Sequence, residues 1–146
     1  MYFEDYKIGR VYKDIEPVSF TEEELIWAGK NYDPRDIHTD KKAAKQSSFG
    51  EIISPGSYSN MVFWGQWVKT GIDKKGMIAG MGIVSASWLR PVFADTPYRI
   101  EEEVVDKKVY KEGESGEVTF EMRVYDPKEK LVSVYSPKGL VAFRSK

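Results

Sequence analysis

The second half of the chain alternates hydrophobic and polar residues with the period of a half-buried β-strand. The clearest run of alternating apolar residues comprises Val118, Phe120, Met122 and Val124. Similar patterns predict further strands over residues 78–89, 99–110 and 131–143. Residues 126–130 read Asp-Pro-Lys-Glu-Lys and are typical of a turn between two strands. This half is therefore expected to form an antiparallel sheet.

The first half is expected to contain short helices joined by loops. Thr21 followed by Glu24 has the form of a capping box, and it predicts a helix that ends near Asn31. Asp40 is expected to cap a second short helix that runs through Ala43 and Ala44. A negative charge is favourable at this end of a helix.

A third, central helix is expected to begin near Ser54 and to end before Gly71. Ser54 is typical of an N-cap, Pro55 of the first helical position, and Gly71 of a C-terminal stop. Apolar residues fall on more than one face of this helix, so it should be largely buried. They are Tyr58, Met61, Val62, Phe63, Trp64, Trp67 and Val68.

Together these elements predict a single α+β domain over residues 1–146, in which an antiparallel sheet wraps a long central helix. No linker, repeat or low-complexity tract divides the chain. One helix covers only one face of such a sheet. We therefore expect the remaining face or edge to bind a second subunit.

Composition excludes several classes of function. Charged residues make up 31% of the chain but nearly cancel to a net charge of −1, which favours neither nucleic acid nor an anionic membrane as a partner. No stretch approaches the ~20 apolar residues of a membrane helix. The chain has no cysteine, which excludes disulfides and thiolate chemistry. The opening residues do not resemble a signal peptide, so we expect a cytoplasmic protein.

His38, the only histidine, lies five residues after Asp33 in a proline-containing segment. Histidine titrates near neutral pH and is the usual choice for proton transfer. A tight loop would allow both side chains to reach one small volume. The structural alternative is that Asp33 braces the turn and His38 packs in the core. One histidine without cysteine also argues against a zinc site.

Several segments together resemble the MaoC-like dehydratases of the hot-dog superfamily, which include the R-specific enoyl-CoA hydratases. These segments are Phe3 to Gly9, Tyr32 to Ala44, Ser48 to Gly50, Ile53 to Gly56, and Trp88 to Thr96. The hydratase signature commonly reads Asp-x-Asn-Pro before an aliphatic residue and histidine. Here Asp33 is followed by Pro34, Arg35 and Asp36 instead.

The resemblance implies a hot-dog fold and reversible hydration of a 2-enoyl thioester, with Asp33 and His38 as catalytic residues. Gly56, near the start of the central helix, is the candidate oxyanion donor, because its N–H has no intrahelical partner. The alternative is that Gly56 only relieves crowding. The motif segments also carry Ser54, Phe49 and Tyr32, which we expect to bind substrate.

The family further implies a homodimer, or a multiple of dimers, acting on acyl-CoA or acyl-carrier thioesters. The reaction is expected to need no metal or redox cofactor. Coenzyme A would enter only as part of the substrate. Asp36 is interpreted as a solvated loop residue and Asp40 as an N-cap. Two alternatives stay open, a hot-dog thioesterase and a non-catalytic acyl-CoA-binding module. Many such thioesterases carry an acidic residue on the central helix, and residues 56–70 contain none.

Overall fold

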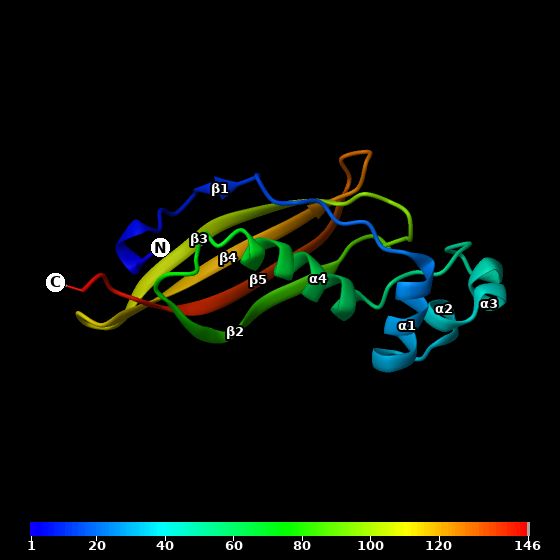
Figure 1. The fold of residues 1–146 in the computed structure, drawn as a ribbon, viewed down its shortest axis with the longest axis horizontal. Helices are drawn as coiled ribbons and strands as arrows, with labels where there is room; N and C mark the ends of the chain where they lie inside the picture. Colours follow the sequence, from blue (N-terminus) through cyan, green and yellow to red (C-terminus); the bar gives the residue numbers. More distant parts are fainter. Residues whose placement is uncertain (146) are drawn as a thin grey trace.

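A five-stranded antiparallel sheet with one long helix along it makes up most of the molecule (Figure 1). The computed structural model describes residues 1–145. Its helices are η1 (Phe3–Asp5), α1 (Glu22–Tyr32), α2 (Asp36–Thr39), α3 (Lys41–Gln46) and α4 (Gly56–Lys69). Its strands are β1 (Val11–Tyr12), β2 (Met77–Trp88), β3 (Arg99–Lys111), β4 (Ser115–Tyr125) and β5 (Leu131–Ala142). They are ordered β1-β3-β4-β5-β2, and all neighbours are antiparallel.

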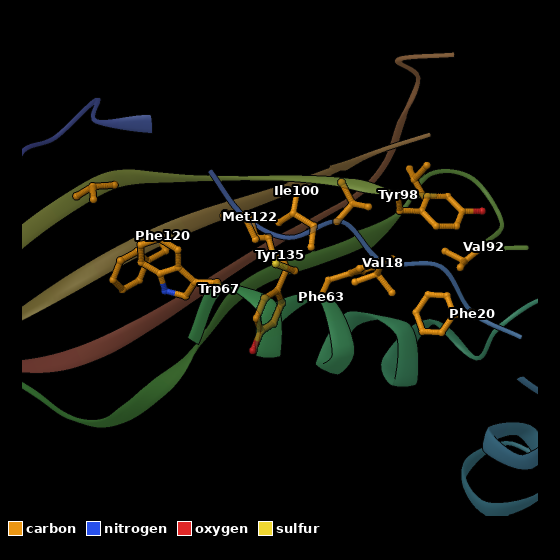
Figure 2. Close-up of a cluster of buried hydrophobic side chains, with 14 of the residues drawn as sticks. Val18, Phe20, Phe63, Trp67, Val92, Tyr98, Ile100, Phe120, Met122 and Tyr135 are labelled. Carbon is orange, nitrogen blue, oxygen red and sulfur yellow. The ribbon is translucent and has the colours of Figure 1, made fainter. Parts of the chain in front are cut away.

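Helix α4 packs against the sheet and supplies the centre of the hydrophobic core. Phe63 and Trp67 point from the helix toward the sheet and are fully buried (Figure 2). The sheet side chains that share this core include Ile100, Val104, Phe120, Met122 and Tyr135. Burial of these large apolar side chains is the dominant stabilising term for such a layer. The predicted α+β arrangement is therefore confirmed.

The start of α4 differs from the expectation. Pro55, not Ser54, is the N-cap residue, and the first helical residue is Gly56. The Ser54 hydroxyl does not cap the helix and instead donates to the Pro55 carbonyl at 2.9 Å. The predicted stop is confirmed, because Gly71 follows the helix with a φ of +72°.

Strand β2 forms one edge of the sheet and is exposed over most of its length. Its paired side lies against β5. Ile78, Ile83, Val84 and Trp88 are each more than half exposed. A long apolar edge strand is a template for pairing with another chain. Among the helices of residues 1–145, none has the length and apolar character needed to cross a membrane.

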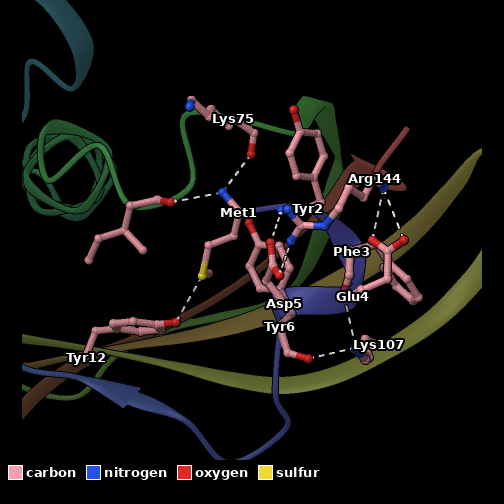
Figure 3. Close-up of polar contacts among 11 residues, drawn as sticks. Met1, Tyr2, Phe3, Glu4, Asp5, Tyr6, Tyr12, Lys75, Lys107 and Arg144 are labelled. Atoms are coloured by element: carbon pink, nitrogen blue, oxygen red, sulfur yellow. Dashed lines mark hydrogen bonds and ion pairs between the residues drawn. The ribbon is translucent and has the colours of Figure 1, made fainter. Parts of the chain in front are cut away.

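The amino-terminal segment is tied down at the end of the molecule opposite α1, α2 and α3 (Figures 1 and 3). The Lys107 ammonium donates to the carbonyls of Phe3 and Tyr6, at 3.1 and 2.7 Å. The Glu4 carboxylate accepts from the Arg144 backbone N–H, with both oxygens 3.1 Å from the nitrogen. The three short helices thus gather at one end, beyond the amino terminus of α4, and both chain ends lie at the other.

Candidate active site

The connection between α1 and α2 brings Asp33 and His38 together. Asp33 is the C-cap of α1, and its N–H donates to the Gly29 carbonyl at 2.9 Å. His38 belongs to the single turn of α2 that follows. The Asp33 Oδ2 atom lies 3.5 Å from His38 Nε2. This separation leaves the two groups facing one another without a close direct hydrogen bond.

A backbone carbonyl fixes the orientation of the His38 ring. His38 is only 6% exposed, and its Nδ1 lies 2.7 Å from the carbonyl oxygen of Ile53. A carbonyl can only accept, so Nδ1 carries the proton. Ile53 is itself held by an N–H bond to the Ile37 carbonyl at 3.3 Å. The other ring nitrogen, Nε2, therefore faces Asp33.

Gly29 of α1 allows His38 to approach this closely. A Cβ atom at Gly29 would lie 2.7 Å from the Cβ and 2.7 Å from the carbonyl oxygen of His38. Any other residue would push the two helices apart. We did not single out Gly29 from the sequence. The available signal was a glycine inside a helical pattern, which often marks a close backbone approach.

Arg35 contacts the second carboxylate oxygen of Asp33, with Nε 3.4 Å from Oδ1. The Arg35 side chain is 81% exposed, so this ion pair adds little to stability. Its geometric effect is to engage Oδ1 while Oδ2 faces His38. Sequence reasoning gave Arg35 no role, because its position beside Asp33 depends on the turn between the helices.

Asp33 and His38 open into a cleft of about 530 Å³ at the amino terminus of α4. The other predicted site residues in its lining are Phe49, Ser54 and Gly56. Tyr32 is not among the lining residues. It is 62% exposed, and its ring stacks on Tyr58 with centroids 6.1 Å apart. The substrate-binding roles of these residues stay predictions.

Gly56 lies at the first position of α4, beside the cleft. Among residues 1–145, its N–H has no backbone or side-chain acceptor, as expected for the first turn of a helix. The positive end of the helix dipole favours negative charge here. A Cβ atom on Gly56 would lie 2.5 Å from Nε1 of Trp88. The missing side chain therefore also relieves crowding with Trp88.

Neither Asp36 nor Asp40 contributes to the cleft. Asp40 caps α3 as predicted, accepting from the N–H groups of Lys42 and Ala43 at 3.0 and 3.1 Å. Asp36 was expected in a loop, and that was wrong, because it is the first residue of α2. Within the described part of the chain, no group of three or more His, Cys, Asp or Glu side chains is arranged to hold a metal ion.

Comparison with known proteins assigns the family. The family model described as "MaoC like domain" matches residues 5–125. The chain belongs to the MaoC-like family. A Bacillus subtilis relative, "Uncharacterized protein YdeM", is 26% identical over 129 residues, which cover 88% of this chain and 90% of the relative.

Solved structures agree with this assignment. A "Monoamine oxidase regulatory protein" from Archaeoglobus superimposes with a TM-score of 0.90 at 29% identity, covering 99% of this chain and 96% of its own. An (R)-hydratase from A. caviae gives a TM-score of 0.71 at 20% identity, covering 97% and 99%. RV0216 from Mycobacterium tuberculosis, described as a double hot-dog fold, gives 0.80 at 16% identity, covering 100% and 45%. The MaoC-like chain therefore has the expected hot-dog fold.

Proposed function

We propose that this MaoC-like protein catalyses the reversible hydration of a 2-enoyl thioester to a 3-hydroxyacyl thioester. The observation that carries the proposal is the arrangement of His38 Nε2 and Asp33 Oδ2, 3.5 Å apart at the wall of one cleft. With the proton on Nδ1, His38 Nε2 can accept a hydrogen bond in that cleft, and so can the Asp33 carboxylate. Two acceptors at this spacing suit one water molecule that donates a hydrogen to each.

The reaction balances with one water and this pair. As the water oxygen bonds to C3, one of its protons passes to the Asp33–His38 pair. The electrons of the C2–C3 double bond move toward the thioester carbonyl, and the pair returns a proton to C2. Because both events use the same pair, both additions occur on one face of the double bond. The reverse sequence dehydrates the 3-hydroxyacyl thioester.

The thioester oxygen gains negative charge during the attack, and it needs hydrogen-bond donors at that moment. Gly56 is our candidate, since its N–H begins α4 and Gly56 lines the same cleft as His38. No metal or redox cofactor enters this scheme. The carrier is coenzyme A or an acyl-carrier protein. The proposed acyl-binding region is the cleft, with Ser54 and Phe49 in its lining and Tyr32 nearby.

Two other functions compete with hydration. A thioesterase would hydrolyse the same substrates, but α4 carries no acidic residue that would suit many hot-dog thioesterases. A binding or regulatory module would retain the cleft without turnover. The Archaeoglobus protein is named a regulatory protein, which favours testing this second possibility.

Turnover with crotonyl-CoA distinguishes the three. Loss of the enoyl absorbance with formation of 3-hydroxybutyryl-CoA supports the hydratase. Release of free coenzyme A supports the thioesterase. Saturable binding without either product supports the binding module. Longer and branched enoyl-CoA substrates, and one acyl-carrier substrate, should accompany crotonyl-CoA so that chain length does not hide an activity.

The proposed working unit is a homodimer or a multiple of dimers. Strand β2 exposes Ile78, Ile83 and Val84 beside an edge that could pair with a second β2. The double hot-dog fold of RV0216 supports a pair of such domains as the unit. Sedimentation at micromolar concentration should show a dimer. A stable monomer would contradict this proposal, and Val84→Lys should weaken the dimer if β2 is the interface.

A further inference from the structure

Trp88 lies across the start of helix α4. It is the last residue of β2, where it pairs with Ser133 of β5, and it is 54% exposed. A Cβ atom built on Gly56 would lie 2.5 Å from Trp88 Nε1, 2.6 Å from Cε2 and 2.7 Å from Cδ1. These three nearly equal distances place the face of the pyrrole ring over the Cα of Gly56. Both residues line the cleft that contains Asp33 and His38.

These contacts bound the distance between two N–H donors. The N and Cβ atoms of one residue are about 2.5 Å apart, so Trp88 Nε1 lies within about 5 Å of the Gly56 nitrogen. Two N–H donors that each lie about 2.9 Å from the same oxygen can be up to about 5.8 Å apart. This limit allows one oxygen to lie within hydrogen-bond distance of both nitrogens, with the indole N–H pointing past Gly56 in the plane of its ring. In the described part of the chain, neither N–H has a hydrogen-bond acceptor.

We propose that the indole N–H of Trp88 is a second donor to the thioester oxygen, beside the N–H of Gly56. The inference rests on the proposed hydration and assigns one further catalytic residue to it. An indole nitrogen only donates and stays protonated, so it favours an oxygen that becomes negative. The glycine is then needed for two reasons, because a side chain there would displace the indole as well as block the thioester.

The competing role for Trp88 is an apolar cover that keeps water from the reacting thioester. Two substitutions separate the roles. Trp88→Phe keeps an aromatic ring and removes the N–H, whereas Trp88→Ala removes both. Donation predicts that both variants lose activity to a similar extent. A cover predicts that Trp88→Phe works nearly normally while Trp88→Ala fails.

The measurement is kcat and KM on the best enoyl thioester, per folded molecule and with the melting temperature of each sample. We expect Trp88→Phe to lower kcat by about 10²- to 10³-fold, as for other oxyanion donors. KM should change by less than about threefold, because the bond strengthens only as charge develops. Trp27→Phe on α1 is the matched control, since Trp27 is 51% exposed and does not line the cleft. It should retain wild-type activity.

The outcomes separate this inference from the function on which it rests. If wild-type protein hydrates the substrate and folded Trp88→Phe keeps more than half of the wild-type kcat, the donor role is wrong and the hydratase stands. If Trp88→Phe changes KM alone, Trp88 only binds substrate and the donor role is again wrong. If wild-type protein turns over no enoyl thioester, the proposed function fails and the donor role fails with it.

Discussion

Asp33 and Glu102 are carboxylates at opposite ends of the central helix, and they have opposite surroundings. The Asp33 side chain is 32% exposed and has two nearby partners, Arg35 and His38. Glu102 on β3 is fully buried, and neither of its oxygens has a hydrogen-bond partner within residues 1–145. Burial raises the pKa of Glu102 well above its ordinary value, and the charge of Asp73 raises it further.

Asp73 belongs to the same end of the molecule. Its carboxylate accepts from the indole N–H of Trp67 at 3.0 Å, while burial raises the pKa of Asp73. It lines a separate cleft of about 340 Å³ with Trp64 and Tyr135. A strongly shifted pKa is often taken as a sign of an active site. Here the shifted pKa values belong to the buried acids Glu102 and Asp73, whereas the Asp33–His38 pair lies in another cleft. A search for shifted pKa values and a search for facing catalytic groups would therefore select different sites.

The largest effect should come from removing either member of the Asp33–His38 pair. We expect Asp33→Asn and His38→Ala each to lower kcat/KM by at least about 10³-fold with little change in melting temperature. The double variant should be scarcely worse than either single one, because residues that act as a unit are non-additive. Steady-state kinetics on crotonyl-CoA checks this. Near-normal turnover in either variant would remove that residue from the mechanism.

A smaller but clear loss is expected for Gly29→Ala. The new Cβ would lie 2.7 Å from His38 Cβ, so His38 must move relative to Asp33. A displacement of about 1 Å can cost about 10²-fold in rate. Kinetics and the pH profile of kcat should both change.

Gly65→Ala is the control for this substitution. Gly65 also lies in a helix, and a Cβ atom there would meet nothing within 4 Å. Both changes raise helix propensity by about 1 kcal/mol. If Gly29→Ala kept the turnover of Gly65→Ala, the close contact with His38 would have no role in positioning the ring.

At the other end of α4, Glu102→Gln should change stability and leave turnover unaltered. The pKa of Glu102 is higher in the folded protein than in the unfolded chain, so the folded state binds its proton more tightly. The contribution of Glu102 to the free energy of unfolding is therefore fully present below about pH 4.5, and it is lost as the pH rises through the pKa of the folded state. The amide of the Glu102→Gln variant cannot ionise, so the variant does not lose stability in this way as the pH rises.

We therefore expect the stability gain of Glu102→Gln to be near zero at pH 4 and to grow toward pH 8. The gain should rise steadily over this range, because burial raises the pKa of Glu102 well above its ordinary value. Urea unfolding at several pH values measures it. A gain that does not depend on pH would show that ionisation of Glu102 is not its cause.

Tyr32→Phe should have the smallest effect of all. The substitution keeps the ring that stacks on Tyr58 and contacts Trp27, and it removes only the exposed hydroxyl. We expect KM and kcat to stay within about threefold of wild type, because rim contacts carry little energy. A much larger rise in KM would place the hydroxyl in direct contact with substrate.

The sequence predicted features that depend on local chemistry. Thr21 accepts from the Glu24 N–H at 3.0 Å as predicted, but the Glu24 carboxylate accepts from the Tyr58 hydroxyl and does not complete the capping box. Gly71 ends α4 with a positive φ, and the four long strands begin and end within three residues of their expected positions. Each of these features is set by neighbouring residues, so periodicity and capping preferences suffice.

Features that depend on distant contacts were beyond sequence patterns. Helix α2 has a single turn, which is too short to show a period, and Asp36 was therefore assigned to a loop. Two close contacts join elements that are not adjacent in the sequence. One is between Gly29 and His38, and the other is between Gly56 and the indole of Trp88. In the sequence, Glu102 is one of several charged residues in a predicted strand, and the pattern does not show that it is buried. Its environment depends on how β3 packs beside Asp73.

The bond from His38 Nδ1 to the Ile53 carbonyl links the Asp33–His38 pair to the segment that enters α4. Ile53 also donates its N–H to the Ile37 carbonyl at 3.3 Å, and Ser54 donates its N–H to the Val92 carbonyl at 2.9 Å. A change that moved residues 53–55 would therefore turn the imidazole and shift the Gly56 N–H at the same time. The proposed proton-transfer pair and the proposed oxyanion donor thus share one backbone support.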